Sequence, residues 1–150
     1  MSSALLSVTY ADHEDTGKDL TFKETLFAIR DKLQAKGFVQ IPQLSSSRPT
    51  NLDETFTLVP AGTQRRKAVM IGINYVGQEP GELSGCHNDV HNMTEYIKQC
   101  HGFSQDDITL LLDDGKHMEP TAKNILTTLG KLAKEAKAGD ALFVHFSGYV

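Results

Sequence analysis

From residue 67 onward, short apolar runs alternate with longer amphipathic segments, and this alternation constrains the fold more than any other feature. Residues 67–74, 108–112 and 141–146 are apolar runs of strand length. Residues 88–100 and 120–138 lie between them and repeat apolar side chains at helical spacing. Strands that alternate with helices are typical of a mainly parallel sheet with helices on both faces. The predicted fold class is therefore α/β, with a mainly parallel sheet.

The first third of the chain follows a different pattern. Apolar side chains recur at helical spacing over residues 21–36, which predicts a helix. Residues 38–44 alternate as in a β-strand, although Pro42 cannot donate a ladder hydrogen bond and indicates an edge position or a strand end. Residues 45–64 contain Ser, Pro and Gly and are typical of a linker.

Charge and apolar content exclude several kinds of partner. The net charge is -4, with 6 basic against 8 acidic residues up to residue 60 and 9 against 11 after it. Neither part is basic, so we expect no nucleic-acid or membrane partner. No apolar run approaches the roughly 18 residues that a membrane-spanning helix needs, and the first residues lack the pattern of a secretory signal. We expect a cytoplasmic protein.

The cysteines and histidines show no spacing typical of a disulfide framework or a zinc site. Cys86 and Cys100 are the only two cysteines, and a single pair supports neither. His87, His91, His101 and His117 have no ligand-like partners in the sequence. We therefore predict no metal and no cofactor in this chain by itself.

The loop at 77–86 contains glycines and precedes a predicted helix, so a phosphate cradle has to be considered. It lacks both GxGxxG and GxxxxGK[ST]. Glu79 and Glu82 would also repel a phosphate. Nucleotide binding is therefore not expected.

Five segments between residues 66 and 148 have a recognisable order and spacing. They are KAVMIGINY at 67–75, LSGCHNDV at 83–90, ITLLLDD at 108–114, PT at 120–121 and GDALFVHFSG at 139–148. Together they resemble the opening of the large subunit of metacaspases, a family of caspase-like cysteine endopeptidases. The resemblance implies an incomplete caspase-like (caspase-hemoglobinase) fold, which has three layers.

Three earlier segments resemble the small-subunit tail at the carboxyl end of metacaspases. They are LTFKETLFAIR at 20–30, KGFVQIPQLSS at 36–46 and LDETFTL at 52–58. Their place ahead of the large-subunit region resembles the order in type III metacaspases; a chimeric gene is the alternative. The implied organisation is a small-subunit-like segment at 1–59, a linker at 60–65 and the N-terminal part of the large-subunit-like domain at 66–150.

The catalytic dyad of the family is a His in Ser-Gly-His-Gly and a Cys in Asp-x-Cys-His-Ser-Gly. Ser147 and Gly148 match the first motif, but Tyr149 occupies the position of the His and Val150 that of the following Gly. The Cys motif is absent. A phenol replaces an imidazole poorly as a general base at neutral pH. We therefore expect an incomplete record of the protein, inactive by itself.

The resemblance also implies roles for residues near the predicted strand ends. Asp89, with Ser147 and Gly148, would bind substrate by helping to form an acidic pocket for Arg or Lys; the alternative is that Asp89 caps a helix starting near Val90. Cys86 would be an auxiliary thiol rather than the nucleophile. His145 is expected to be packed or hydrogen-bonded within its strand.

Two functions remain open at this point. The first is part of a cysteine endopeptidase whose peptide or protein substrates carry Arg or Lys before the scissile bond. For the complete family member, the resemblance implies calcium as a cofactor and a link to programmed cell death. The second is a non-catalytic, pseudoprotease-like interaction module, which the replacement of His by Tyr149 motivates.

Overall fold

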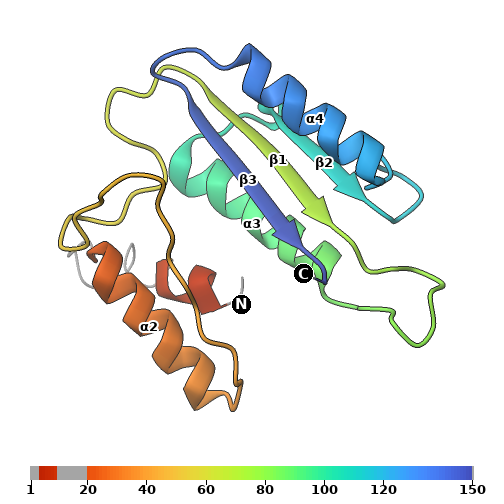
Figure 1. Cartoon of the computed structure of the whole chain (residues 1–150), viewed down its shortest axis with the longest axis horizontal. Helices are drawn as coiled ribbons and strands as arrows, with labels where there is room; N and C mark the ends of the chain where they lie inside the picture. Colours follow the sequence, from red (N-terminus) through yellow and green to blue (C-terminus); the bar gives the residue numbers. More distant parts are fainter. Residues whose placement is uncertain (1–3, 10–19, 150) are drawn as a thin grey trace. The chain divides into compact units, whose positions relative to one another are not determined.

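The computed structural model describes residues 4–9 and 20–149, and the chain divides into two compact units, Met1–Thr57 and Leu58–Val150. Figure 1 shows both, with the first unit in red to orange and the second in yellow to blue. Among the described residues, no helix has the length and apolar character needed to span a membrane.

The main element of the first unit is helix α2, Phe22–Ala35, which confirms the helix predicted over 21–36. Its N-terminus is closed by a capping box. The Glu24 amide donates to Thr21 Oγ1 at 3.1 Å, and the Thr21 amide donates to Glu24 Oε2 at 2.9 Å. These two bonds satisfy backbone donors that the first helical turn would otherwise leave without partners.

A second, short helix at residues 4–9 was not predicted. It packs on α2 through a small core made of Ala4, Val8, Ile29 and Leu33. Lys32 Nζ also donates to the Ser7 carbonyl at 2.7 Å. The described part of this helix is too short to show helical periodicity in the sequence, and its buried side chains pack on α2.

The strand predicted at 38–44 is wrong. These residues form no strand, and Phe38, Val39 and Ile41 are exposed. The described residues of this unit hold one isolated bridge, between Thr21 and Thr55, and no sheet that residues 38–44 join. An alternating sequence forms a strand only when a neighbouring strand accepts its backbone hydrogen bonds.

The second unit is built on a three-stranded parallel sheet. Its strands are β1, Arg66–Gly72, β2, Ile108–Leu112, and β3, Ala141–Ser147, in the order β2-β1-β3. All three apolar runs predicted as strands are confirmed, with small shifts at their ends. In register, Gly72 of β1 lies between Leu112 of β2 and Ser147 of β3.

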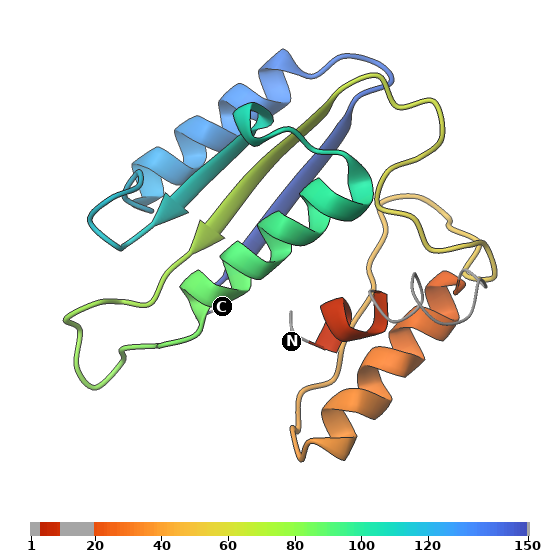
Figure 2. The ribbon, with the colours of Figure 1, turned by 180° about the vertical axis from the view of Figure 1, so that it is seen from behind.

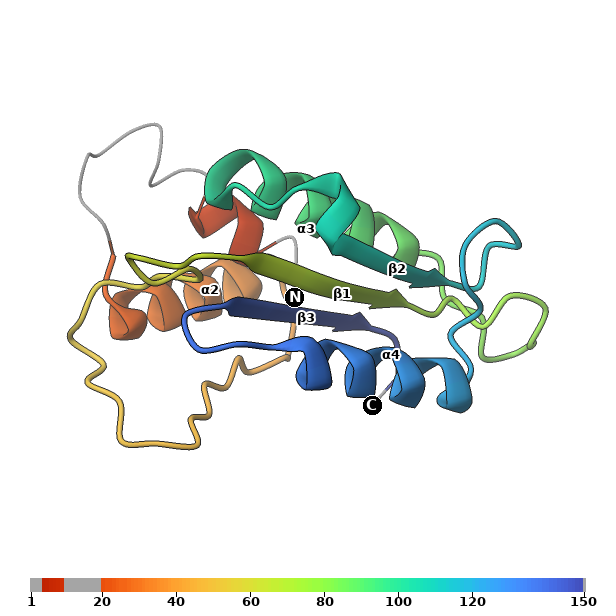
Figure 3. The ribbon, with the colours of Figure 1, turned by 90° about the horizontal axis from the view of Figure 1, so that it is seen from above.

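Two helices cover the opposite faces of this sheet, as the edge-on view in Figure 3 shows. Helix α3, Cys86–His101, lies on the face turned to the viewer in Figure 2, and α4, Ala122–Glu135, lies on the other. The predicted three-layer α/β arrangement is confirmed. On the α4 side, the core joins Val69, Ile71 and Leu111 of the sheet to Ile125, Leu129 and Leu132 of the helix. On the opposite face, α3 contributes buried Val90, Met93 and Ile97.

Strand β3 is covered on one face only. Its side chains alternate between the α3 side, where Phe143, His145 and Ser147 are half-buried, and the α4 side, where Leu142, Val144 and Phe146 are exposed. Helix α4 packs over β1 and β2 instead. The chemistry-bearing residues of β3 therefore belong to the α3 side.

Candidate functional site

The three parallel strands end at one edge of the sheet, and the residues that follow them meet there. Asn74 follows β1, Asp113 follows β2, and Ser147 ends β3. The N-terminus of α3 lies at the same edge, because the Cys86 amide donates to Asn74 Oδ1 at 2.9 Å. Ligands of open α/β sheets bind beyond the carboxyl ends of the strands, so this edge is the candidate site.

Asp89 and Ser147 meet at this edge although they are 58 positions apart in the chain. The Ser147 hydroxyl donates to Asp89 Oδ2 at 3.0 Å. Asp89 lies in the first turn of α3, where the positive end of the helix dipole favours a carboxylate. The structure thus joins two of the three predicted substrate-binding residues.

The alternative reading of Asp89 as a helix cap is wrong. Helix α3 begins at Cys86 rather than near Val90, its N-cap is Gly85, and that cap position has no side-chain hydrogen bond. Asp89 is therefore inside the helix, and its carboxylate accepts a hydrogen bond from β3 instead.

Gly148, the third predicted substrate-binding residue, lies where the chain leaves β3. A Cβ at this position would come within 3.1 Å of the Phe146 ring and 3.4 Å of the Tyr75 hydroxyl. Cys86 is buried, and Cys100 is half-buried. Both are free thiols that no disulfide links. Cys86 lies in the first turn of α3, three residues before Asp89.

Tyr149, which occupies the predicted position of the dyad His, is exposed and contacts Tyr75. The two ring centroids are 5.1 Å apart, and the Tyr149 amide donates to the Tyr75 hydroxyl at 3.2 Å. The segment after β3 is thus anchored to the loop after β1. The phenol at position 149 lies at the same edge as Asp89 and Ser147.

His145 lies on the same face of β3 as Ser147, two residues earlier. It is largely buried, and its Nε2 has no hydrogen-bond partner among the described residues. Burial lowers the pKa of His145, and the charge of Asp89 opposes that shift only in part. The ring is therefore packed, as expected, and neutral at neutral pH.

Sequence reasoning missed a hydrogen-bonded pair at the end of β2. His87 Nε2 donates to Asp113 Oδ1 at 2.6 Å, and the same carboxylate accepts from the Asn74 amide at 2.9 Å and the Val76 amide at 3.2 Å. Partial burial by itself would raise the pKa of Asp113, but the bonds from Asn74, His87 and Val76 outweigh it and lower the pKa. The motif segments contain Asn74, His87 and Asp113, yet nothing in their local spacing indicates the contact.

A second pair follows directly and has a local role. Asp114 accepts from the amides of Lys116 and His117 at 2.9 and 3.0 Å and from His117 Nδ1 at 2.8 Å. Burial opposes these bonds, but together they hold the pKa of Asp114 well below its ordinary value. This carboxylate closes its own turn.

Within residues 4–9 and 20–149, no group of three or more His, Cys, Asp or Glu side chains is arranged to hold a metal ion. Two of the carboxylates near the candidate site are instead paired with imidazoles, Asp113 with His87 and Asp114 with His117.

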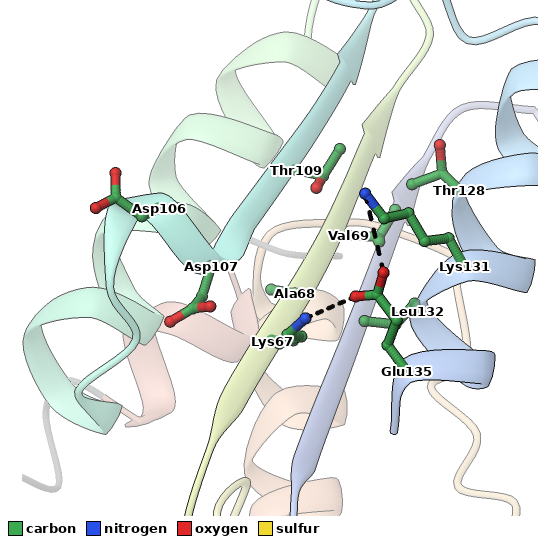
Figure 4. Close-up of a pocket in the computed structure, with 10 residues that line it drawn as sticks. All are labelled: Lys67, Ala68, Val69, Asp106, Asp107, Thr109, Thr128, Lys131, Leu132 and Glu135. Atoms are coloured by element: carbon green, nitrogen blue, oxygen red, sulfur yellow. Dashed lines mark hydrogen bonds and ion pairs between the residues drawn. The ribbon is translucent and has the colours of Figure 1, made fainter. Parts of the chain in front are cut away.

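A separate cavity of about 150 Å³ lies at the opposite end of the strands (Figure 4). It is open to solvent, and side chains from β1, β2 and α4 line it. Glu135 pairs with Lys67 at 2.9 Å and with Lys131 at 4.0 Å across this cavity. Because Glu135 is paired with both lysines and the cavity is remote from the carboxyl ends of the strands, we do not assign the site to it.

Comparison with known proteins supports the resemblance seen in the sequence. Residues 66–150 match the family described as "Metacaspase, peptidase C14 domain". The chain is 51% identical to Metacaspase III c of Phaeodactylum tricornutum over 149 residues, which is 99% of this chain and 44% of that protein. It is 48% identical to Metacaspase-1A of Aspergillus clavatus over 89 residues, 58% of this chain and 20% of that protein.

The coverage differs between these relatives in an informative way. The Phaeodactylum protein aligns over nearly the whole chain, whereas the Aspergillus protein aligns over 58% of it. The chain spans less than half the length of either relative. Both the matched family and the near-complete alignment lead to one conclusion: this chain belongs to the metacaspase family of peptidases.

Proposed function

We propose that this chain supplies part of the substrate cleft of a cysteine endopeptidase, and that Asp89 binds the Arg or Lys side chain before the scissile bond. The observation that carries the proposal is the Asp89 carboxylate, held at the carboxyl edge of the sheet by the Ser147 hydroxyl. Ser147 bonds to one carboxylate oxygen, and the described residues place no Lys or Arg on Asp89. A guanidinium or ammonium group is the natural partner for such a carboxylate.

His145 supports this assignment. Its pKa is lowered by burial, so at neutral pH it adds no positive charge beside Asp89. The negative charge of Asp89 therefore remains available for a cationic side chain. Under this proposal, calcium is a cofactor of the longer family members.

The binding test uses the chain itself with benzamidine, a small cation of the guanidinium class, and benzyl alcohol as an uncharged aromatic control. We expect benzamidine to shift the NMR amide signals of residues 86–90 and 147–149. Asp89→Asn should weaken this binding about 10-fold or more, because it removes a charge-assisted pair. Asp106→Asn, which removes an exposed acid at the other end of the strands, is the matched control. Equal binding by wild type and Asp89→Asn would overturn the proposal.

We further propose that the chain does not cleave peptides by itself, because Tyr149 occupies the dyad His position and no residue here matches the dyad Cys. The test combines the purified chain with an Arg-terminated fluorogenic peptide and calcium, and we expect no turnover. Turnover that disappears in Cys86→Ala would make Cys86 a nucleophile. Turnover that persists in Cys86→Ala would place the chemistry elsewhere. Either result would contradict the proposal.

The replacement of His by Tyr149 also favours a second function, that of a non-catalytic module that captures basic peptides. The two functions share the Asp89 pocket and differ in catalysis. Binding of an intact Arg peptide without cleavage by the complete protein would favour the module, and cleavage by that protein would favour the peptidase.

A further inference from the structure

One carboxylate holds both ends of the loop between β1 and α3. At the start of this loop, the amides of Asn74 and Val76 donate to Asp113 Oδ1 and Oδ2. At its end, His87, the second residue of α3, donates to Asp113 Oδ1. Asp113 itself belongs to neither element, because it follows β2. A single side chain therefore joins the ends of β1 and β2 to the start of α3.

Asn74 extends this connection toward the helix. Its side-chain oxygen accepts from the Cys86 amide at 2.9 Å, and its carbonyl accepts from the Leu83 amide at 2.7 Å. Asn74 is itself buried, so each of these bonds is shielded from water. The first turn of α3, which carries Asp89, is thereby attached to Asp113 twice, through Asn74 and through His87.

The Asp113 carboxylate also fixes the backbone on both sides of Tyr75. Tyr75 has a φ of 56°, a left-handed conformation that is uncommon for a bulky residue. The amides on either side of it, those of Asn74 in front and Val76 behind, are the two that donate to Asp113. In this conformation the Tyr75 hydroxyl accepts from the Tyr149 amide and its ring lies 5.1 Å from that of Tyr149.

The neighbouring carboxylate shows that this arrangement is specific to Asp113. Asp114 bonds to Lys116 and His117, within three residues of itself, and reaches neither the loop nor the helix among its described contacts. The partners of Asp113 lie 26 to 39 positions away. The two adjacent Asp–His pairs thus form an internal comparison, one between elements and one within a turn.

We propose that Asp113, together with His87, is the positioning residue of the candidate site: it holds Tyr75 and the first turn of α3 in place, and so sets Asp89 against Ser147. This inference rests on the proposed function for the role of Asp89 in binding a cation. The positioning of the loop and the helix by Asp113 is independent of that role and is measured separately.

The first measurement is amide hydrogen exchange by NMR on the full 150-residue chain. Asp113→Ala should speed exchange of the Asn74 and Val76 amides about 10-fold or more, because it removes hydrogen bonds to a charged acceptor. It should also speed exchange of the Cys86 amide, which Asp113 does not contact. Amides in the centre of β1, at Val69 and Ile71, report global stability and should change much less.

His87 variants separate the two ends of the loop. His87→Ala should speed exchange at Cys86 and in the first turn of α3 while leaving the Val76 amide close to wild type. His87→Gln keeps an N–H donor of similar reach and should restore the wild-type pattern. Asp114→Ala is the matched control, and it should change only Lys116 and His117. If Asp113→Ala does not fold, Asp113→Asn retains one acceptor oxygen and should show the same pattern in weaker form.

The second measurement is benzamidine affinity. Asp113→Ala should weaken binding several-fold although Asp89 is intact, and Asp114→Ala should not. Exchange at Cys86 that stays at the wild-type rate in Asp113→Ala, or an equal response to Asp114→Ala, would overturn the positioning role. Loss of protection at Asn74, Val76 and Cys86 in a chain whose wild type does not bind benzamidine would uphold the positioning role and overturn the proposed function.

Discussion

Gly72 is the residue that sets how closely α3 packs against the carboxyl end of β1. A Cβ at this position would lie 2.9 Å from Leu112 Cδ2, 2.9 Å from Val90 Cγ2 and 3.0 Å from the Cys86 carbonyl oxygen. The third contact is with backbone, which cannot rotate away as a side chain can. The absence of a side chain at Gly72 therefore allows α3 to begin beside the ends of β1 and β2, where Asp89 reaches Ser147.

We expect Gly72→Ala to lower the free energy of unfolding by about 1–3 kcal/mol, because it overpacks a filled core. Urea unfolding followed by circular dichroism measures this change. Gly130→Ala, within α4, is the matched control: an added Cβ there meets nothing within 4 Å, and the change should stabilise the helix by roughly 0.5–1 kcal/mol. Changes of the same sign in both variants would contradict this account of Gly72.

Among the elements, α3 and α4 begin at residues that hydrogen bonds at their N-termini determine. Predicted helices at 88–100 and 120–138 become Cys86–His101 and Ala122–Glu135 in the structure. The first begins earlier than predicted, directly after Gly85, at Cys86. The amide of Cys86 donates a hydrogen bond to Asn74 Oδ1. The second begins after Thr121, whose hydroxyl accepts from the Asn124 amide. Periodicity located these helices, and hydrogen bonds at their ends set their bounds.

We expect Thr21→Ala to destabilise α2 by about 1 kcal/mol, because it removes the side-chain half of the capping box. Faster amide exchange within Phe22–Ala35 would report the loss. Lys23→Ala changes an exposed residue of the same turn whose side chain has no capping role, so it should leave exchange close to wild type. An equal effect of the two substitutions would argue against the capping box as the cause.

Strands behaved differently from helices, and segment 38–44 shows why. Residues 38–44 alternate in sequence as a strand does, yet they pair with no strand among the described residues, whereas β3 pairs with β1 over seven residues. A helix satisfies most of its backbone hydrogen bonds within itself. A strand depends on a partner that is distant in sequence, so its local pattern predicts less.

At the scale of the whole molecule, stability depends on pH in two separate windows. His145 has a pKa below its ordinary value of 6.5, so the folded state releases its proton more readily than the unfolded state. Asp113 has a pKa below its ordinary value of 3.8. For both groups, the unfolded state binds more protons as the pH falls below the ordinary value, and stability decreases with acidification.

We therefore expect the free energy of unfolding to decline first as the pH falls below about 6.5 and again below about 4, through the carboxylates. Urea unfolding at pH values from 3 to 8 measures both declines. His145→Gln should remove much of the first, and Asp113→Asn should reduce the second in part, because Asp114 also has a lowered pKa. A pH dependence unchanged by His145→Gln would show that another group titrates in the upper window.

Periodicity and motifs in the sequence predicted the type and order of the strands and α-helices from residue 66 onward and the family to which the chain belongs. These properties follow from local periodicity and from motifs that are read along the chain, and the matched family at residues 66–150 confirms them. The resemblance also gave Asp89 and Ser147 as candidate substrate-binding residues, although it could not show that their side chains form a hydrogen bond with each other.

The contacts between distant residues could be known only from the tertiary structure. Asp113 lies 39 positions from Asn74 and 26 from His87, and Ser147 lies 58 from Asp89. Such contacts depend on strand order, on the register of β1 with both neighbours, and on the position at which α3 begins. Local patterns carry no information on these three quantities, because they arise from the joint packing of all the elements around one sheet.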